Sequence, residues 1–176
     1  MIYFIRHGES EANLKHVFAG QKEDSKLTEL GREQARSEGQ KIKDLGLTID
    51  QILSSPLIRA LDTARIVSKI IGYNKEMAID PRITEYDMGS LTGTPTYDIS
   101  SKMLVRAENA ENPKAFNDRV RSLLVEYSKK DANILLVSHA GVGRIIETIR
   151  KGIDPELFYD LPPYPNASVI KLDWLK

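Results

Sequence analysis

The sequence contains no cysteine among its 176 residues. This absence excludes disulfides, thiolate nucleophiles and cysteine-ligated zinc sites. No stretch approaches the ~18 consecutive apolar residues that a membrane-spanning helix needs. The apolar run at the N-terminus is too short for the core of a signal peptide. We therefore expect a cytoplasmic protein that has no membrane as a partner.

The chain also has no excess of either charge, with 25 Lys and Arg against 25 Asp and Glu. A strongly basic balance is typical of nucleic-acid-binding proteins, so its absence argues against a nucleic-acid partner. Net charge does not describe how charges are distributed, and a local basic pocket remains compatible with this composition. No internal repeat or linker divides the chain, so we predict a single domain over residues 1–176.

Short apolar runs alternate with longer helical patterns along the chain. The apolar runs predict strands at residues 2–5, 49–53, 77–79 and 134–137, and an edge strand at 168–174. The helical patterns predict helices at 28–45, 56–72, 113–127 and 142–150, the second with Ser55 as its N-cap and Pro56 at its first position. This alternation predicts an α/β fold, a three-layer α/β/α sandwich with a mainly parallel sheet. The edge strand either stays covered or pairs with a second copy in a homodimer.

Residues 84–111 are rich in Gly, Ser, Thr, Asn and Asp, which predicts a long loop with one short helix near 100–106. Loops of this length in compact domains are usually functional or disordered. We therefore expect a lid-like insertion over the substrate. Tyr86, Met88, Tyr97 and Met103 either give this lid an apolar surface or pack within the loop.

Two predicted strands each deliver a histidine to their carboxyl end. His7 follows residues 2–5 directly after Arg6, and His139 follows residues 134–137. Arg59 lies near the start of the helix after the second strand. Because the carboxyl ends of parallel strands share one edge of a sheet, we expect these side chains in one cleft near helix N-termini. Cations and N–H donors predict a phosphate site, and the lack of metal-ligand spacing around the histidines predicts a metal-independent one.

Several motifs occur together in an order that resembles the histidine phosphatase superfamily, also called the phosphoglycerate mutase-like family. The resemblance covers nearly the whole chain. Its motifs are R-H-G-E-S at 6–10 with Asn13, L-T-E-L-G-R-E-Q-A at 27–35, S-S-P-L-I-R-A-L-D-T-A at 54–64, Glu85 with Gly89 and Gly93, S-H-A-G at 138–141 and N-A-S-V at 166–169. Many relatives have glycine where Ala140 stands, a small change that we expect the family's chemistry to tolerate.

This resemblance implies phosphoryl transfer at the cleft. His7 would be the nucleophile and form a phosphohistidine, while Arg6, Arg59 and His139 would stabilise charge on the phosphoryl oxygens. Glu85 would protonate the leaving oxygen and later activate water. No cofactor is implied for hydrolysis.

The residues around His7 are also implicated in phosphate binding by the resemblance. Gly8, Ser10 and Asn13 would contact the phosphoryl group, although Asn13 also suits a turn and Ser10 also suits a cap. The role of Glu9 stays open between capping and substrate contact. His16 lies in a polar segment, and we expect it to be exposed, with substrate contact left open.

The segment after Glu85 is shorter than the insertion usual in the family's bisphosphoglycerate-dependent mutases. A shorter segment implies a more open pocket, which favours the phosphatase branch and a small phosphorylated metabolite as the substrate. The alternatives are a phosphoglycerate mutase using 2,3-bisphosphoglycerate as phosphate donor, a phosphoprotein phosphatase, and a non-catalytic phosphate-binding module.

Overall fold

A computed structural model describes residues 1–175 of the chain. Within this range five strands form one sheet in the order β3-β2-β4-β1-β5. The strands are β1 (Ile2–Arg6), β2 (Gln51–Ser54), β3 (Ala78–Ile79), β4 (Ile134–Ser138) and β5 (Val169–Lys171). Strands β1 to β4 are parallel, and β5 runs antiparallel to β1 at the edge. The predicted mainly parallel sheet with one edge strand is confirmed.

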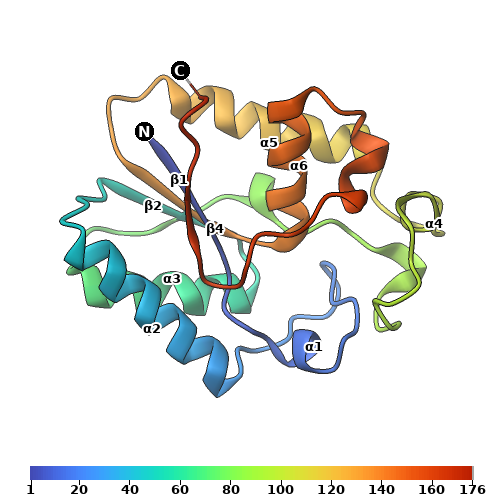
Figure 1. Ribbon diagram of the computed structural model, residues 1–176, viewed down its shortest axis with the longest axis horizontal. Coiled ribbons are helices and arrows are strands. Elements are labelled where there is room, and N and C mark those ends of the chain that lie inside the picture. The colour runs from blue at the N-terminus through green and yellow to red at the C-terminus, as the bar shows by residue number, and fades with distance from the viewer. Residues whose placement is uncertain (176) are drawn as a thin grey trace.

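Helices cover both faces of this sheet (Figure 1). One face packs against α2 (Glu29–Asp44) and α3 (Ile58–Ile71), and the other against α5 (Pro113–Ser128) and α6 (Ala140–Lys151). Two short helices, α1 (Glu11–Leu14) and α4 (Ser101–Val105), lie outside these layers. Short 3-10 segments span Pro81–Ile83, Gly89–Leu91 and Pro155–Asp160. The predicted three-layer sandwich is therefore confirmed, and within residues 1–175 no helix has the length and apolar character to cross a bilayer.

The apolar run of β4 explains why the sheet is covered on both sides. All five of its residues are buried. Ile134 and Leu136 belong to the cluster under α5 and α6, while Leu135 and Val137 belong to the cluster under α2 and α3. Because successive side chains of a strand point to opposite faces, a continuous apolar run requires a helical layer on each face.

The predicted start of the second long helix was wrong. Helix α3 begins at Ile58 rather than Pro56, and Ser55 is not its N-cap. The carboxylate of Asp24 accepts a hydrogen bond from the Ile58 N–H at 2.7 Å. A distant loop therefore supplies the acceptor that the local Ser-Pro pattern was expected to supply, and the Ser55 hydroxyl contacts His139 instead.

Other boundaries differ by a few residues from those predicted. Helix α6 starts at Ala140, directly after His139, and the edge strand is confined to Val169–Lys171. Helix α1 was not predicted, because a four-residue helix carries too little apolar periodicity to be detected. The short helix predicted near 100–106 is confirmed as α4.

The segment 84–111 packs more tightly against the domain than a solvent-exposed loop would. Tyr86 is fully buried, with its ring 5.3 Å from that of Phe116 and 5.0 Å from that of Phe158. Tyr86 is therefore a core residue and offers no surface to a substrate. Tyr97 and Met103 are exposed, and Met88 lines a cavity. Closure of this segment over a substrate stays a prediction.

Candidate active site

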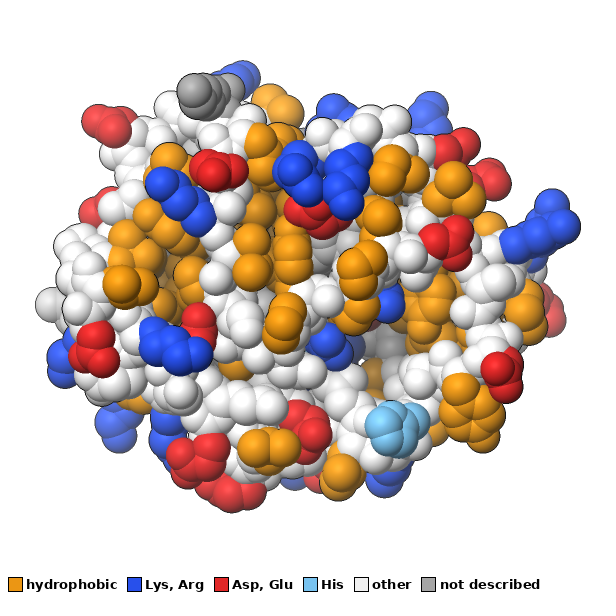
Figure 2. Space-filling view, in the orientation of Figure 1, with side chains coloured by type: hydrophobic (Ala, Val, Ile, Leu, Met, Phe, Trp, Pro, Cys, Tyr) orange, Lys and Arg blue, Asp and Glu red, His pale blue; other side chains and the backbone are white. Residues whose placement is uncertain are grey.

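A cavity of about 280 Å³ opens at the carboxyl ends of β1 and β4. Figure 2 shows basic side chains inside a hollow of this face, with a histidine at its edge. Six of the residues expected from the sequence line the cavity, namely Arg6, His7, Ser10, Asn13, Arg59 and Glu85. The predicted gathering of strand-end and helix-start residues at one edge of the sheet is thus present in the structure.

His7 is buried and its ring orientation is fixed. The Nδ1 atom lies 2.6 Å from the carbonyl oxygen of Gly8. Since a carbonyl only accepts, Nδ1 carries the proton and Nε2 keeps its lone pair. Burial, and next the positive charges of Arg59 and Arg6, hold the pKa of His7 well below its usual range. The imidazole is therefore neutral near pH 7, the form that a nucleophile requires.

Gly8 positions His7 through its backbone. A Cβ at Gly8 would lie 2.2 Å from the carbonyl oxygen of Gly31, so only glycine permits this approach to α2. The Gly8 N–H donates to the Thr63 hydroxyl at 3.1 Å. Gly8 does not line the cavity. In this structure it orients the His7 ring, and direct contact with a phosphoryl group stays a prediction.

His139 lies beside His7 at the end of β4, with ring centroids 5.2 Å apart. Its Nε2 lies 2.7 Å from the Ser55 hydroxyl, which leaves Nδ1 facing no partner among residues 1–175. Burial, with Arg59 next, holds the pKa of His139 well below its usual range. His139 is fully buried and does not itself line the cavity, so its contact with a phosphoryl group stays a prediction.

The two predicted arginines are held by backbone carbonyls. Arg59, 2% exposed, donates from Nη2 to Gly20 at 2.8 Å, and Arg6 donates from Nη1 to Tyr164 at 3.0 Å. The buried Nε of Arg6 has no partner within the described part of the chain. Burial lowers the pKa of Arg6 to about 10, so it stays cationic near pH 7. Carbonyl oxygens orient both side chains, and a carboxylate oxygen of Asp24 lies 4.0 Å from Nη1 of Arg59.

Glu85 is buried at the other side of the cavity. Its Oε1 accepts from the N–H of Tyr86 at 2.8 Å, and its Oε2 accepts from the N–H of Gly141 at 3.2 Å. A Cβ at Gly141 would lie 2.2 Å from Oε1. The glycine of the S-H-A-G motif therefore makes room for the carboxylate that the resemblance makes the acid and base.

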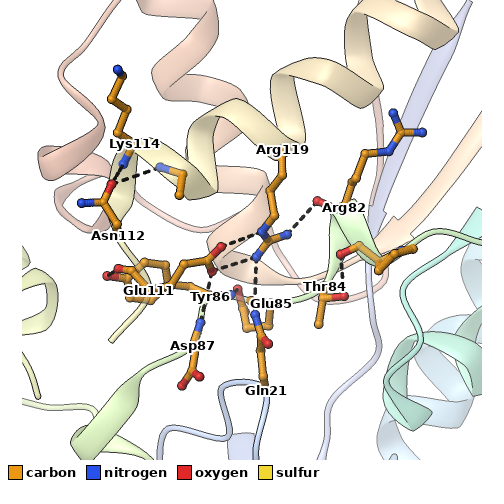
Figure 3. Close-up of polar contacts among 12 residues, drawn as sticks. Gln21, Arg82, Thr84, Glu85, Tyr86, Asp87, Glu111, Asn112, Lys114 and Arg119 are labelled. Carbon is orange, nitrogen blue, oxygen red and sulfur yellow. Dashed lines mark hydrogen bonds and ion pairs between the residues drawn. The ribbon is translucent and has the colours of Figure 1, made fainter. Parts of the chain in front are cut away.

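The backbone of Glu85 is held by a side-chain network that the sequence did not reveal (Figure 3). Arg119 donates from Nη1 to the carbonyl of Arg82 at 2.7 Å and from Nη2 to that of Glu85 at 3.1 Å. Both carboxylate oxygens of Glu111 pair with Arg119, at 2.7 and 2.9 Å. Gln21 donates to the same Glu85 carbonyl at 2.7 Å. The network therefore holds the backbone from Arg82 to Glu85 in place.

Asn13 acts as a turn residue and also lines the cavity. With Ser10 it forms a capping box at the start of α1, in which Asn13 Oδ1 accepts from the Ser10 N–H at 3.2 Å. Asn166 donates to the His7 carbonyl at 2.8 Å and lies 3.5 Å from the same Asn13 oxygen. Glu9 accepts from the hydroxyl of Thr28, the N-cap of α2, so its observed contact favours capping.

Arg144, Tyr159 and His16 also line the cavity, and the sequence assigned no role to Arg144 or Tyr159. Arg144 lies on α6 one turn after Ala140, and Tyr159 lies in the 3-10 segment below it. His16 is exposed, as expected, and also lines the cavity. Arg144 was detectable in principle, because a helix that starts at the carboxyl edge of a sheet directs its first turns toward that edge.

A model of the histidine phosphatase superfamily (branch 1) matches residues 2–176. The chain belongs to this superfamily. The resemblance predicted from the sequence motifs is therefore confirmed. The protein is an enzyme of a phosphoryl-transferring superfamily that includes phosphatases and mutases.

Some of the similar proteins are named mutases and others are named phosphatases. "Probable phosphoglycerate mutase GpmB" of Enterobacter sp. (strain 638) is 32% identical, over 98% of this chain and 84% of that protein. A 2,3-bisphosphoglycerate-dependent phosphoglycerate mutase of Rhizobium meliloti is 37% identical, over 57% of this chain and 48% of that protein. A phosphoserine phosphatase mutant of Entamoeba histolytica, solved with phosphoserine, superposes with a TM-score of 0.77 at 27% identity, over 96% of this chain and 87% of that one.

Proposed function

We propose that this enzyme is a metal-independent phosphomonoesterase that hydrolyses a small phosphorylated metabolite through a phosphohistidine on His7. The supporting observation is the neutral His7 ring, whose Nδ1–H donates to the Gly8 carbonyl and whose Nε2 keeps its lone pair beside the positive charges of Arg59 and Arg6. The buried Nε–H of Arg6, which has no partner within residues 1–175 and belongs to a cavity-lining residue, fits an oxygen of a phosphoryl group.

The first step transfers the phosphoryl group to the enzyme. The lone pair of His7 Nε2 forms an N–P bond while the bond from phosphorus to the ester oxygen breaks. The leaving oxygen takes the electron pair of that bond and a proton from Glu85. Arg6, Arg59 and His139 stabilise the charge on the three equatorial oxygens.

The second step returns the enzyme to its starting state. The Glu85 carboxylate accepts a proton from a water molecule as the water oxygen attacks phosphorus. The N–P bond breaks, its electron pair returns to Nε2, and inorganic phosphate is released. One carboxyl group serves both steps, because the first leaves it ionised for the second.

The size of the cavity supports a small substrate. A volume of about 280 Å³ lies below the usual range for drug-sized ligands, roughly 300–1,000 Å³. A phosphoryl group with a leaving group of a few heavy atoms suits this space better than a folded phosphoprotein does.

The second candidate is a phosphoglycerate mutase, which the names of two relatives favour. A mutase uses the same phosphohistidine but returns the phosphoryl group to a sugar acid.

One pair of assays separates the two activities. The purified enzyme is incubated with p-nitrophenyl phosphate, and separately with 3-phosphoglycerate plus a catalytic amount of 2,3-bisphosphoglycerate. Phosphate release in the first assay with little isomerisation in the second supports the phosphatase. Rapid formation of 2-phosphoglycerate with negligible phosphate release identifies a mutase and overturns the proposal.

A further inference from the structure

Arg119, on α5, joins the two ends of the segment 84–111 (Figure 3). At the first end, its Nη1 and Nη2 donate to the carbonyls of Arg82 and Glu85, at 2.7 and 3.1 Å. At the last end, its Nε and Nη2 donate to the two carboxylate oxygens of Glu111, at 2.7 and 2.9 Å. One guanidinium group therefore contacts both ends of the segment at the same time.

Direct contacts between the two ends close the segment into a loop. The Tyr86 hydroxyl donates to the carbonyl of Glu111, which lies 25 residues further along the chain. The N–H of Glu111 donates in turn to the carbonyl of Asp87 at 2.9 Å. The chain therefore leaves the loop at Glu111, beside the point where it enters the loop after Glu85. Loss of the pair between Arg119 and Glu111 would weaken both ends together, because one side chain serves both.

The backbone around Glu85 is irregular and lies between the 3-10 segments Pro81–Ile83 and Gly89–Leu91. Outside regular structure, buried carbonyls need other partners, and here side chains supply them. The carbonyl of Ile83 accepts from the Ser138 hydroxyl at 2.7 Å, just as that of Glu85 accepts from Arg119. The position of the Glu85 carboxylate therefore depends on side chains from distant parts of the chain.

Neither Arg119 nor Glu111 lines the cavity, whereas Glu85 does. The side chains of Arg119 and Glu111 are 19% and 16% exposed, so water screens their pair less than it screens a surface pair. Two parallel hydrogen bonds to a carboxylate also fix the plane of the guanidinium group. Because neither side chain reaches a substrate in the cavity, any effect of this pair on the reaction has to pass through Glu85.

We propose that Arg119 is a positioning residue for Glu85, and that its pairing with Glu111 makes the position of the Glu85 carboxylate depend on closure of the segment 84–111. This inference rests on the proposed function. The segment then contributes to the reaction by fixing the acid and base, in addition to any cover that it gives the substrate. A displacement of about 1 Å can cost roughly 100-fold in rate, so a modest loosening is measurable.

The test compares an ester whose leaving group needs a proton with one whose leaving group does not. In Arg119→Met, kcat/KM for glycerol 3-phosphate should fall by about tenfold to 100-fold, and kcat/KM for p-nitrophenyl phosphate should fall much less. Glu111→Gln should act in the same direction by a smaller factor, because one oxygen acceptor remains. Arg119→Lys should restore only part of the loss, because its ammonium lacks the planar fork. If Arg119→Met does not fold, the other two variants provide the same comparison.

Arg121→Met and Glu126→Gln are the matched controls, since both residues are exposed on the same helix, α5. Glu126 pairs with Arg82 at 2.8 Å, so its variant removes an ion pair near the network and leaves the contacts to Glu85 in place. Both controls should keep the kcat/KM of the unaltered enzyme for each ester. Equal losses for the two esters in the test variants, or no loss, overturn the inference, and so does full activity of Arg119→Lys.

Amide hydrogen exchange provides a readout that does not depend on turnover. The N–H of Tyr86, which donates to Oε1 of Glu85 at 2.8 Å, reports the position of the carboxylate, and the N–H of Glu111 reports closure of the segment. Both should exchange about tenfold faster or more in Arg119→Lys than in Arg121→Met. Unchanged exchange overturns the positioning role. If exchange is faster but the unaltered enzyme hydrolyses neither ester, the proposed hydrolysis fails while the positioning of Glu85 by Arg119 stands.

Discussion

Substituting Gly141 by alanine should disable the acid of the proposed mechanism without unfolding the protein. The new Cβ would lie 2.2 Å from Oε1 of Glu85, well inside any van der Waals contact. Ordinary carbon contacts begin near 3.5 Å, so the carboxylate must shift by about 1 Å. It would then lose the 3.2 Å hydrogen bond from the Gly141 N–H. A displacement of this size can cost roughly 100-fold in rate.

The leaving group distinguishes loss of the acid from general damage. A nitrophenolate leaves readily without a proton, whereas an alkyl alkoxide does not. We therefore expect kcat/KM for glycerol 3-phosphate to fall by about 100-fold, and kcat/KM for p-nitrophenyl phosphate to fall much less, because kcat/KM reports the first step and not the later attack of water. Equal losses for both esters, or no loss, would refute the assignment of Glu85 as the general acid.

Gly39→Ala provides the matched control. Gly39 is a buried glycine of α2 and is far in sequence from the cavity residues. A Cβ at Gly39 would lie 3.2 Å from the Ile70 side chain. Both substitutions place alanine in a helix, which by propensity favours folding by about 0.5–1 kcal/mol. Thermal denaturation should find both variants folded, and Gly39→Ala should keep the rate of the unaltered enzyme with each ester.

Three further outcomes are expected. After brief incubation with a ³²P-labelled substrate, an alkaline quench and an alkaline gel, the unaltered enzyme should carry label and His7→Ala none; a labelled His7→Ala enzyme would move the nucleophile elsewhere. Activity should persist in EDTA, and a loss restored by a divalent ion would contradict the metal-independent mechanism. Because the pKa values of His7 and His139 are lowered in the folded state, the unfolded chain binds more protons below its ordinary histidine pKa near 6.5, so stability should fall as the pH drops through that value. Each buried histidine adds up to about 1.4 kcal/mol per pH unit to this dependence. Urea unfolding between pH 7.5 and 5.5 should therefore show that the free energy of unfolding of His7→Asn depends less on pH than that of the unaltered enzyme.

Local patterns were sufficient to predict the sheet and the core of the site. The continuous apolar run of β4 predicts a strand that is buried on both faces. Because β4 runs parallel to β1, the histidine that follows β4 lies at the same edge of the sheet as the histidine that follows β1. The same reasoning placed His7 after β1. Arg59 was also placed correctly, although the cap expected for its helix was wrong, because the side chain's position depends on the helix and not on the group that caps it.

Contacts between distant segments were beyond such patterns. Asp24 caps α3 from 34 residues away, and Arg119 reaches the carbonyl of Glu85 across 34 residues. Nothing in the local sequence marks either residue as a partner. Tyr86 was also beyond local patterns. The residues around it in the sequence predict a polar loop, whereas its ring packs against those of Phe116 and Phe158.

The same burial lowers the pKa values of both the histidines and the arginines of the site. Desolvation is the largest cause of the lowered pKa of His7, and also of the lowered pKa of Arg6. Lysine in place of Arg6 would begin from a lower pKa, and comparable burial would bring its ammonium closer to neutrality near pH 7. Arginine therefore suits this position, because it alone stays charged under the conditions that keep the neighbouring nucleophile uncharged.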